Sequence, residues 1–170
     1  MTPELEPTPG PAPQTLDRAG IAARIPHAGT MCLLDALHGW SDGSIHCSTR
    51  HHAAPDHPLR GASGLLAPTA IEYASQAMAL HAGLMARPGE PPRAGFLAAV
   101  RNVVMRQARL DTAPGPLHVR AERLLGDARQ AQYRFTLHDG EGLLLVEGRA
   151  TVVLDGSPAD PLSTSSPTTA

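Results

Sequence analysis

One long apolar stretch, residues 61–86, restricts the possible folds of this chain more than any other part of the sequence. Its only formally charged residue is Glu72, and it contains no proline from residue 69 onward. Residues that favour helices dominate it, so the pattern predicts a helix over residues 69–86. Because apolar side chains lie on every side of that helix, we expect it to be buried at the centre of the fold. Its alanines let other backbone approach closely, and Pro68, Glu72 and Gln76 interrupt the stretch too much for a membrane span.

The rest of the chain contains segments that alternate between apolar and polar residues, as strands do. Before the helix, residues 31–50 predict a hairpin with its turn at residues 41–43. After the helix, four strands are expected, at residues 95–110, 117–122, 131–138 and 144–154. Turn residues between them predict an antiparallel meander. The expected fold class is therefore α+β, with a strongly curved antiparallel sheet wrapped around one long central helix.

Composition divides the chain into one domain and two polar ends. Residues 1–20 are rich in proline, and residues 156–170 are rich in serine, threonine and proline, so both are expected to be disordered. Residues 21–155 form the expected single domain, which is long enough for a hydrophobic core. The N-terminal segment lacks the basic start and apolar run of a signal peptide, which predicts a cytoplasmic protein. Cys32 and Cys47 are accordingly expected to be buried free thiols.

Charge and residue usage exclude several classes of function. The formal net charge is −2 and aromatic residues make up 3% of the chain, so the positive charge and stacking side chains of nucleic-acid-binding proteins are missing. All 14 basic residues are arginine. The absence of lysine excludes Schiff-base chemistry and a phosphate-loop lysine.

Glu72 is the clearest candidate for chemistry. Burial in an apolar helix disfavours its charged form whereas the helix dipole favours it, and a carboxyl group between these effects is a candidate acid or base. A structural role is the alternative, because residues 69–72 fit a capping box in which Thr69 caps the helix and Glu72 bonds back to its amide. Gln76 lies one turn later on the same face and could orient the carboxylate. His81 is expected on the helix surface or in a dimer contact.

Histidines supply candidate partners for Glu72. His27 lies at the entrance to the first predicted strand, and His51, His52 and His57 lie in the loop that leads to the helix. Any of these four could face Glu72 as a general base. Their spacing matches no fixed set of metal ligands, so no metal is expected.

Two stretches resemble the dehydratases that act on 3-hydroxyacyl thioesters of carrier proteins, which have the hotdog fold. Residues 25–27 (Ile-Pro-His) and 31–35 (Met-Cys-Leu-Leu-Asp) are similar to their Leu-Pro-His-Arg…Leu-Leu-Val-Asp opening. Residues 71–77 (Ile-Glu-Tyr-Ala-Ser-Gln-Ala) are similar to their helix motif Leu-Glu-x-Met-Ala-Gln. The similarity is closest to a divergent subfamily that occurs with aryl-polyene-type biosynthetic genes.

The resemblance implies a hotdog dimer that converts a 3-hydroxyacyl thioester to the trans-2-enoyl thioester in fatty-acid- or polyene-type biosynthesis. A histidine removes the α-proton while the helix carboxylate, here Glu72, protonates the departing hydroxyl. The two groups of one site come from opposite subunits. The substrate is carried on the phosphopantetheine of an acyl carrier protein, and no further cofactor is implied. Pro68, Thr69 and Gln76 are expected to contact the substrate, with amides at the helix start polarising the thioester carbonyl.

The histidine of the family pattern has no exact counterpart in this chain. Family members carry Gly-His-Phe-Pro…Met-Pro-Gly before the helix, whereas this chain has Asp-His-Pro-Leu at residues 56–59 and Leu-Ala at residues 66–67. His57 is the nearest match, one residue out of register relative to Glu72. The base is therefore His57, His27 or a histidine of a related partner subunit, and the dimer is a homodimer or a heterodimer.

Two other functions fit the same residues. A hotdog acyl-thioesterase would use Glu72 to attack the thioester or to activate water, and it would release a free thiol rather than form an enoyl thioester. A non-catalytic hotdog subunit would only shape an acyl tunnel in its partner, with Glu72 as a helix cap. In that case Glu72→Gln would leave the activity of the complex nearly intact.

Overall fold

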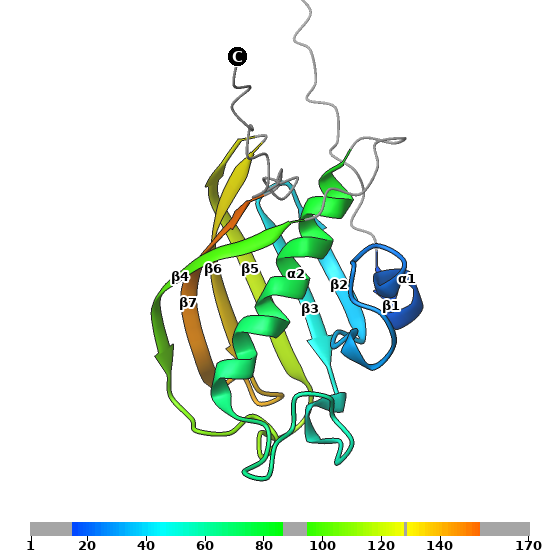
Figure 1. The fold of residues 1–170 in the computed structure, drawn as a ribbon, viewed down its shortest axis with the longest axis vertical. Coiled ribbons are helices and arrows are strands. Elements are labelled where there is room, and N and C mark those ends of the chain that lie inside the picture. The colour runs from blue at the N-terminus through cyan, green and yellow to red at the C-terminus, as the bar shows by residue number, and fades with distance from the viewer. Residues whose placement is uncertain (1–14, 87–94, 128, 154–170) are drawn as a thin grey trace, which may run out of the picture.

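The computed structural model describes residues 15–86, 95–127 and 129–153. Within them, one long helix lies against a seven-stranded antiparallel sheet (Figure 1), which is the α+β arrangement that the sequence predicts. The helices are α1 (Arg18–Ala22) and α2 (Ala70–Met85), with 3-10 turns η1 (Gly29–Met31), η2 (His51–Ala53) and η3 (Ala67–Thr69). The strands are β1 (Leu16–Asp17), β2 (Ala36–Ser41), β3 (Ser44–Thr49), β4 (Phe96–Met105), β5 (Leu117–Gly126), β6 (Gln130–His138) and β7 (Leu144–Val153).

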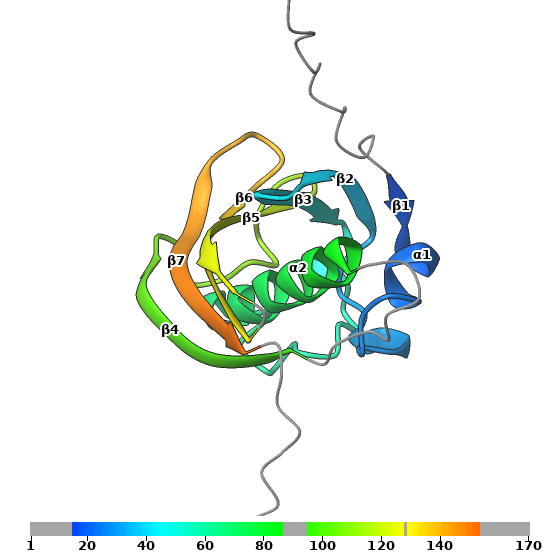
Figure 2. The same cartoon turned by 90° about the horizontal axis from the view of Figure 1, so that it is seen from above.

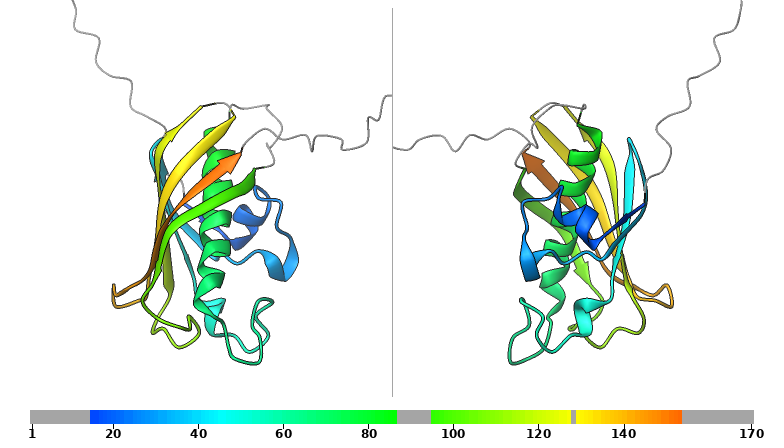
Figure 3. Two further views of the ribbon diagram at one scale, coloured as in Figure 1. Left: turned by 60° about the vertical axis from the view of Figure 1, so that its left-hand side comes forward. Right: turned by 90° about the vertical axis from the view of Figure 1, so that its right-hand side faces the viewer.

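The sheet curves around α2, as Figure 2 shows from above and Figure 3 from two sides. Ala70, Ala74 and Ala77 are fully buried on the helix face that packs against β3 and β5. Small side chains at these positions let the backbone of the sheet approach the helix closely. The core of the domain therefore lies between the concave face of the sheet and this alanine-rich face of α2.

The strand order differs from the predicted meander at one strand. The order is β1-β2-β3-β5-β6-β7-β4, so β2 and β3 form the predicted hairpin and β5, β6 and β7 form a meander. The prediction that β4 continues into β5 as a neighbour is wrong, because β4 pairs with β7 at the far edge of the sheet. After β4 the chain bonds to the segment before α2: the Leu110 N–H donates to Leu65 O and the Ala67 N–H donates to Ala108 O, at 2.8 and 2.9 Å. These bonds carry the chain across the end of the sheet from one side to the other.

One face of α2 remains half-buried. Tyr73 and Gln76 are fully buried, whereas Glu72, Ser75 and Ala79 are only partly covered. The prediction of a helix buried on every side is therefore wrong for this face, because the sheet and the segment before β2 enclose only part of the circumference. The half-buried face carries the candidate site.

The described fold begins before residue 21, where the sequence places the start of the domain. Leu16 pairs with Leu37 of β2, and Asp17 caps α1 by accepting the Gly20 N–H at 2.8 Å. The rest of the predicted disordered lead and the whole predicted tail lie outside the described residues. Both cysteines are free and buried, as predicted. No helix in the described part of the chain is long and apolar enough to cross a membrane.

Candidate active site

Gln76 joins the candidate carboxylate to the segment that precedes β2. Its side chain is fully buried, and its amide nitrogen donates to Glu72 Oε1 at 2.9 Å and to Met31 O at 2.8 Å. Its amide oxygen accepts the Leu33 N–H at 2.8 Å. The Leu33 N–H would otherwise be buried without a partner, and the three bonds together hold the amide in one orientation. Gln76 therefore fixes the carboxylate of Glu72, as the spacing on the helix predicts.

His27 lies in the segment that follows α1, and its side chain contacts Glu72. Its Nε2 lies 3.1 Å from Glu72 Oε1, and the two side chains are 26% and 32% exposed. The preceding Ile25 is buried in the core and anchors this segment beside the helix. The Nδ1 atom of His27 is shielded from solvent and has no hydrogen-bond partner among the described residues. Any proton exchange with a substrate therefore takes place at Nε2, beside the carboxylate.

A cavity of about 200 Å³ begins at this pair and follows the half-buried face of α2. Residues 72, 75, 79 and 82 recur at helical spacing along one side, and the start of β4 forms another. Apart from His27, Glu72 and Ser75, the side chains are apolar or absent. At 1.5 Å per residue, the helix side of the cavity is about 15 Å long. The lining residues are Pro26, His27, Glu72, Ser75, Ala79, Ala82, Gly95, Phe96, Leu97 and Val152.

The predicted capping box at the start of α2 is wrong. Thr69 makes no side-chain bond to the helix amides; its hydroxyl donates to Leu66 O at 2.7 Å, and its own N–H donates to the same oxygen at 3.0 Å. The reason is η3, a 3-10 turn with Pro68 near its start, which joins directly onto α2 and uses these groups. The N–H of Ala70 likewise donates to carbonyls of η3. The carboxylate of Glu72 is thus left for His27 and Gln76, and the Thr69 and Ala70 amides are not free to polarise a carbonyl.

His57 lies elsewhere, and the structure does not bring it to Glu72. It is 6% exposed; its Nδ1 accepts the Leu59 N–H at 3.1 Å and its Nε2 lies 2.8 Å from the Tyr73 hydroxyl. Because Nδ1 accepts, the neutral ring carries its proton on Nε2 and donates it to Tyr73. Burial lowers the pKa of His57, and the nearby His52 lowers it further. Both ring nitrogens of His57 therefore bond to groups of the same chain.

Asp35, the acid of the Leu-Leu-Asp opening, bonds to several segments near the site but does not contact His27 or Glu72. Its carboxylate accepts from Arg18 at 3.0 Å, from the Arg50 N–H at 2.7 Å, and lies 2.7 Å from His51 Nδ1. Burial on its own would raise the pKa of Asp35, but the hydrogen bonds from Arg50 and His51 outweigh it and lower that pKa. Asp35 thereby ties α1 to the end of β3 and holds the segment that carries His27.

His81 is a core residue, so its expected place on the helix surface is wrong. It is fully buried; its Nε2 donates to Ser41 O at 2.7 Å and its Nδ1 lies 3.0 Å from the Tyr133 hydroxyl. Burial lowers the pKa of His81. A sequence pattern of alanines and methionines gave no sign that a polar partner would reach the helix at this position.

Ser75, Ala79 and Ala82 were not singled out by sequence reasoning, although they line the cavity. The available signal was their spacing of three, seven and ten residues after Glu72, which places small side chains on its face of the helix. This spacing indicates a shared face only if Glu72 is first assumed to belong to the site.

The comparisons with known proteins identify a family for the chain. A family model matches residues 19–161 and describes an ApeP-like family, the ApeP dehydratase. The chain belongs to this family. The resemblance to divergent hotdog dehydratases of the aryl-polyene type is thereby confirmed. Comparison with curated proteins gives no match.

Solved structures confirm the hotdog fold. The chain is similar to the dehydratase heterocomplex ApeI:P from Xenorhabdus doucetiae, with a TM-score of 0.72, 23% identity, and coverage of 81% of this chain and 91% of that one. It is also similar to a hypothetical thioesterase with coenzyme A from Streptococcus pneumoniae TIGR4 (TM-score 0.52, 13% identity, 71% and 84% covered). A third match is PaaI from the phenylacetic acid degradation operon of E. coli (TM-score 0.52, 10% identity, 69% and 80% covered).

Proposed function

We propose that this protein dehydrates a 3-hydroxyacyl thioester, carried on an acyl carrier protein, to the trans-2-enoyl thioester. One observation carries the proposal: His27 Nε2 and Glu72 Oε1 lie 3.1 Å apart at the end of an apolar cavity. The reaction needs one base and one acid within reach of adjacent carbons, and this pair supplies both. Membership of a dehydratase family supports the same reaction class.

In the proposed reaction His27 Nε2 takes the proton from the α-carbon, and the electrons of that C–H bond form the new double bond. The bond from the β-carbon to the hydroxyl oxygen breaks, and Glu72 protonates that oxygen so that it leaves as water. His27 then carries one proton more and Glu72 one fewer than at the start. Their direct contact allows the proton to pass from His27 back to Glu72, which restores the starting state.

The cavity is suited to the acyl chain rather than to the carrier. Ser75, Ala79 and Ala82 leave space along the helix, and Phe96 and Leu97 of β4 supply apolar surface. The acyl chain lies along this face in the proposal, and its β-carbon is beside Glu72. The thioester then lies near His27 and the start of α2, although Pro68 and Thr69 do not line the cavity itself. The phosphopantetheine arm belongs to the carrier protein, and we propose no other cofactor because the reaction uses only acid and base groups.

A second hotdog subunit is part of the proposal, because β4 offers an edge for one. Within the described residues, β4 pairs on one side only, with β7. Five of its large apolar side chains are more than a third exposed, which is unusual for an uncovered edge strand: Phe96, Leu97, Val100, Val104 and Met105. Pairing there would cover the open side of the cavity, since Phe96 and Leu97 belong to both surfaces. The partner is a second copy or a related subunit, and we propose that the complex works in the cytoplasm.

The experiment compares the purified full-length protein with its Glu72→Gln variant on a 3-hydroxyacyl thioester of a carrier protein. We expect the wild type to form the enoyl thioester, and the variant to be about 10²- to 10⁴-fold slower, since this is the usual contribution of a positioned acid or base. Release of free thiol in place of the enoyl product would identify a thioesterase. Equal rates for wild type and variant would leave Glu72 a structural residue and overturn the proposal.

A further inference from the structure

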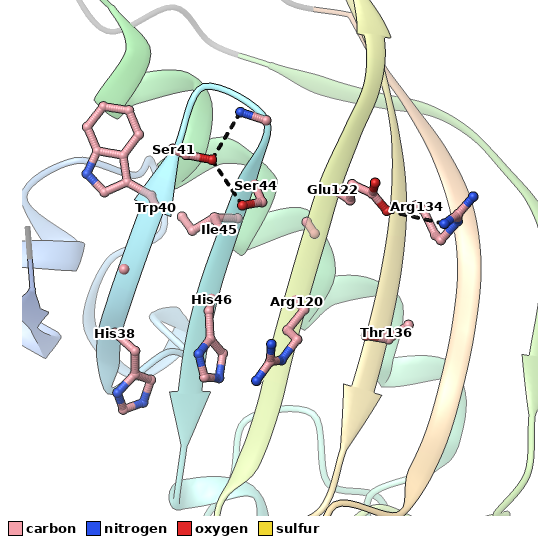
Figure 4. A pocket seen from close by; sticks show the side chains of 13 residues that line it. His38, Trp40, Ser41, Ser44, Ile45, His46, Arg120, Glu122, Arg134 and Thr136 are labelled. Carbon is pink, nitrogen blue, oxygen red and sulfur yellow. Dashed lines mark hydrogen bonds and ion pairs between the residues drawn. The ribbon is translucent and has the colours of Figure 1, made fainter. Parts of the chain in front are cut away.

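Three histidines on the outer face of the sheet lie far from any role in the proposed reaction. His38, His46 and His118 come from β2, β3 and β5, and each offers a ring nitrogen that lies within 4.8 Å of those of the other two. Their strand neighbours Leu37 and Cys47 are buried on the opposite face, toward α2. Figure 4 shows His38 and His46 projecting from this outer face, with the helix behind the sheet. We call these three residues the histidine cluster.

A β-bulge brings the first member of the cluster to the second. The register between β2 and β3 shifts between Leu37 and Gly39, so that Gly39 pairs with His46 and His38 is the additional residue. Bulges of this kind redirect a side chain. Because Gly39 has no side chain opposite His46, the ring of His38 lies over that position, with its centroid 4.8 Å from the centroid of His46. The bulge and the glycine together make the contact possible.

The second and third members are already as close as metal ligands are. His46 Nε2 and His118 Nδ1 lie 3.1 Å apart. Two ligands at 2.0–2.1 Å from a tetrahedral zinc ion are separated by about 3.3 Å, so this pair fits one edge of such a site. His38 is exposed and offers a ring nitrogen within 4.8 Å of those of the other two histidines. Its Nε2 bonds to Ser48 Oγ at 2.7 Å, the type of outer contact that orients metal-binding histidines.

The surroundings keep two of the rings in the form that binds metals. Burial lowers the pKa of His46 to about 4, and Arg120, His38 and His118 add to the effect. Burial also lowers the pKa of His118, with further contributions from His38, Arg120, His138 and Arg50. A neutral imidazole is the form that binds metals, and the direction of both shifts favours it. The positive charge of Arg120, an exposed side chain, opposes a bound cation.

We propose that the histidine cluster binds one divalent late transition metal ion, with zinc as the ion used to test it. Imidazole nitrogens suit zinc, copper and nickel, and three histidines leave one position for water. His38 and His46 border a hollow of about 700 Å³ on the outer face, so solvent reaches the site. The ion would join three neighbouring strands that are otherwise linked by backbone hydrogen bonds. The site is separated from Glu72 by the full thickness of the sheet and the helix.

The test measures zinc binding to untagged full-length protein by equilibrium dialysis and calorimetry. We expect one zinc ion per chain, and a loss of affinity of about tenfold or more in His38→Ala, His46→Gln and His118→Gln, since even outer contacts of metal ligands are worth that much. His51→Gln is the matched control, because His51 is an exposed histidine outside the cluster. Arg120→Gln should bind zinc more tightly than the wild type, because it removes an opposing charge.

A measurement on the unaltered protein covers the case in which a variant does not fold. Copper(II) bound in place of zinc should show, by electron paramagnetic resonance, coupling to three imidazole nitrogens. Zinc should also raise the Tm of the wild type, because an ion that binds only the folded state stabilises it. Absence of saturable zinc binding would overturn the proposal. So would binding that the cluster variants leave unchanged, or a copper spectrum with fewer than three imidazole nitrogens.

Discussion

His27 and His57 lie beside consecutive residues of α2, and their surroundings differ in almost every respect. His27 contacts Glu72 at 3.1 Å on the half-buried face, where a cavity begins. His57 contacts Tyr73 at 2.8 Å in the interior and also accepts a backbone N–H. Successive helix residues differ in direction by about 100°, so Glu72 and Tyr73 cannot serve the same site. The comparison shows that a histidine near a helix is a catalytic candidate only if its reactive nitrogen lies at a cavity that a substrate can enter.

The largest expected effect is a difference in catalytic activity between variants of His27 and of His57. We expect His27→Gln to lower kcat/KM by about 10²- to 10⁴-fold, because it removes the group that accepts the α-proton. His57→Gln should retain activity within a few-fold, since His57 does not touch the cavity. Steady-state kinetics on one carrier-bound substrate measure both. Equal losses in the two variants would contradict the assignment of His27 as the group that accepts the α-proton.

The cavity gives the next prediction, which concerns chain length. In Ala79→Leu the larger side chain would occupy the middle of the cavity beside α2. We expect kcat/KM for a long acyl substrate to fall about tenfold or more, whereas a short-chain substrate, which does not reach residue 79, should react at nearly the wild-type rate. The ratio of the two rates is the measurement, and the short substrate is its own control for folding. A uniform loss for both substrates would place the acyl chain elsewhere.

Gln76 bonds both to Glu72 and to the segment that precedes β2, so its replacement should affect stability as well as activity. Gln76→Leu leaves the buried Leu33 N–H and the half-buried Met31 carbonyl without their partner. Each buried polar group left unpaired costs about 1–3 kcal/mol, and we expect the free energy of unfolding to fall by about 3 kcal/mol in total. Urea unfolding measures the change. A loss below about 1 kcal/mol would show that water replaces the amide and that Glu72 is oriented by other contacts.

The smallest effect is the contribution of His57 to the pH dependence of stability. The pKa of His57 is lowered by burial, so the folded protein binds fewer protons than the unfolded chain below the ordinary histidine value of about 6.5. The stability that His57 contributes is therefore complete above that pH and is lost as the pH falls toward its folded pKa. We expect the drop in Tm between about pH 7.5 and about pH 5 to be smaller in His57→Gln than in the wild type. An unchanged drop would show that His57 does not titrate in this range.

The parts of the fold that depend on local pattern could be predicted from the sequence. The helix expected at residues 69–86 is observed as α2, Ala70–Met85, because its composition and breaker residues act within a few turns. The position of β4 could not be predicted in the same way. Its pairing with β7 joins residues about 50 apart in the chain, and only the bonds between residues 65–67 and 108–110 reveal the route. Sequence alternation indicates a strand but not its neighbour.

The candidate site was predictable in its members but not in its geometry. Glu72, Gln76 and His27 were all singled out by motif and spacing, and the structure places the three together. His57 was singled out by its motif too, but a shift of one residue relative to the family pattern coincides with its contact to Tyr73. The capping role of Thr69 was inferred from a four-residue pattern. It is wrong because Pro68 lies in a 3-10 turn, Ala67–Thr69, that joins directly onto the helix.

The family resemblance implies that the two groups of one site come from opposite subunits, whereas His27 and Glu72 of a single chain are in contact in the structure. Co-expression of two inactive variants distinguishes these two arrangements. His27→Gln and Glu72→Gln chains with different tags would be produced together, and dimers that carry both tags would be purified and assayed. If the pair acts within a chain, every site in these dimers lacks one group, and we expect activity no higher than in either variant alone. If each site takes its histidine and its carboxylate from opposite subunits, one intact site forms per dimer. Recovery of about half the wild-type activity would therefore contradict the account.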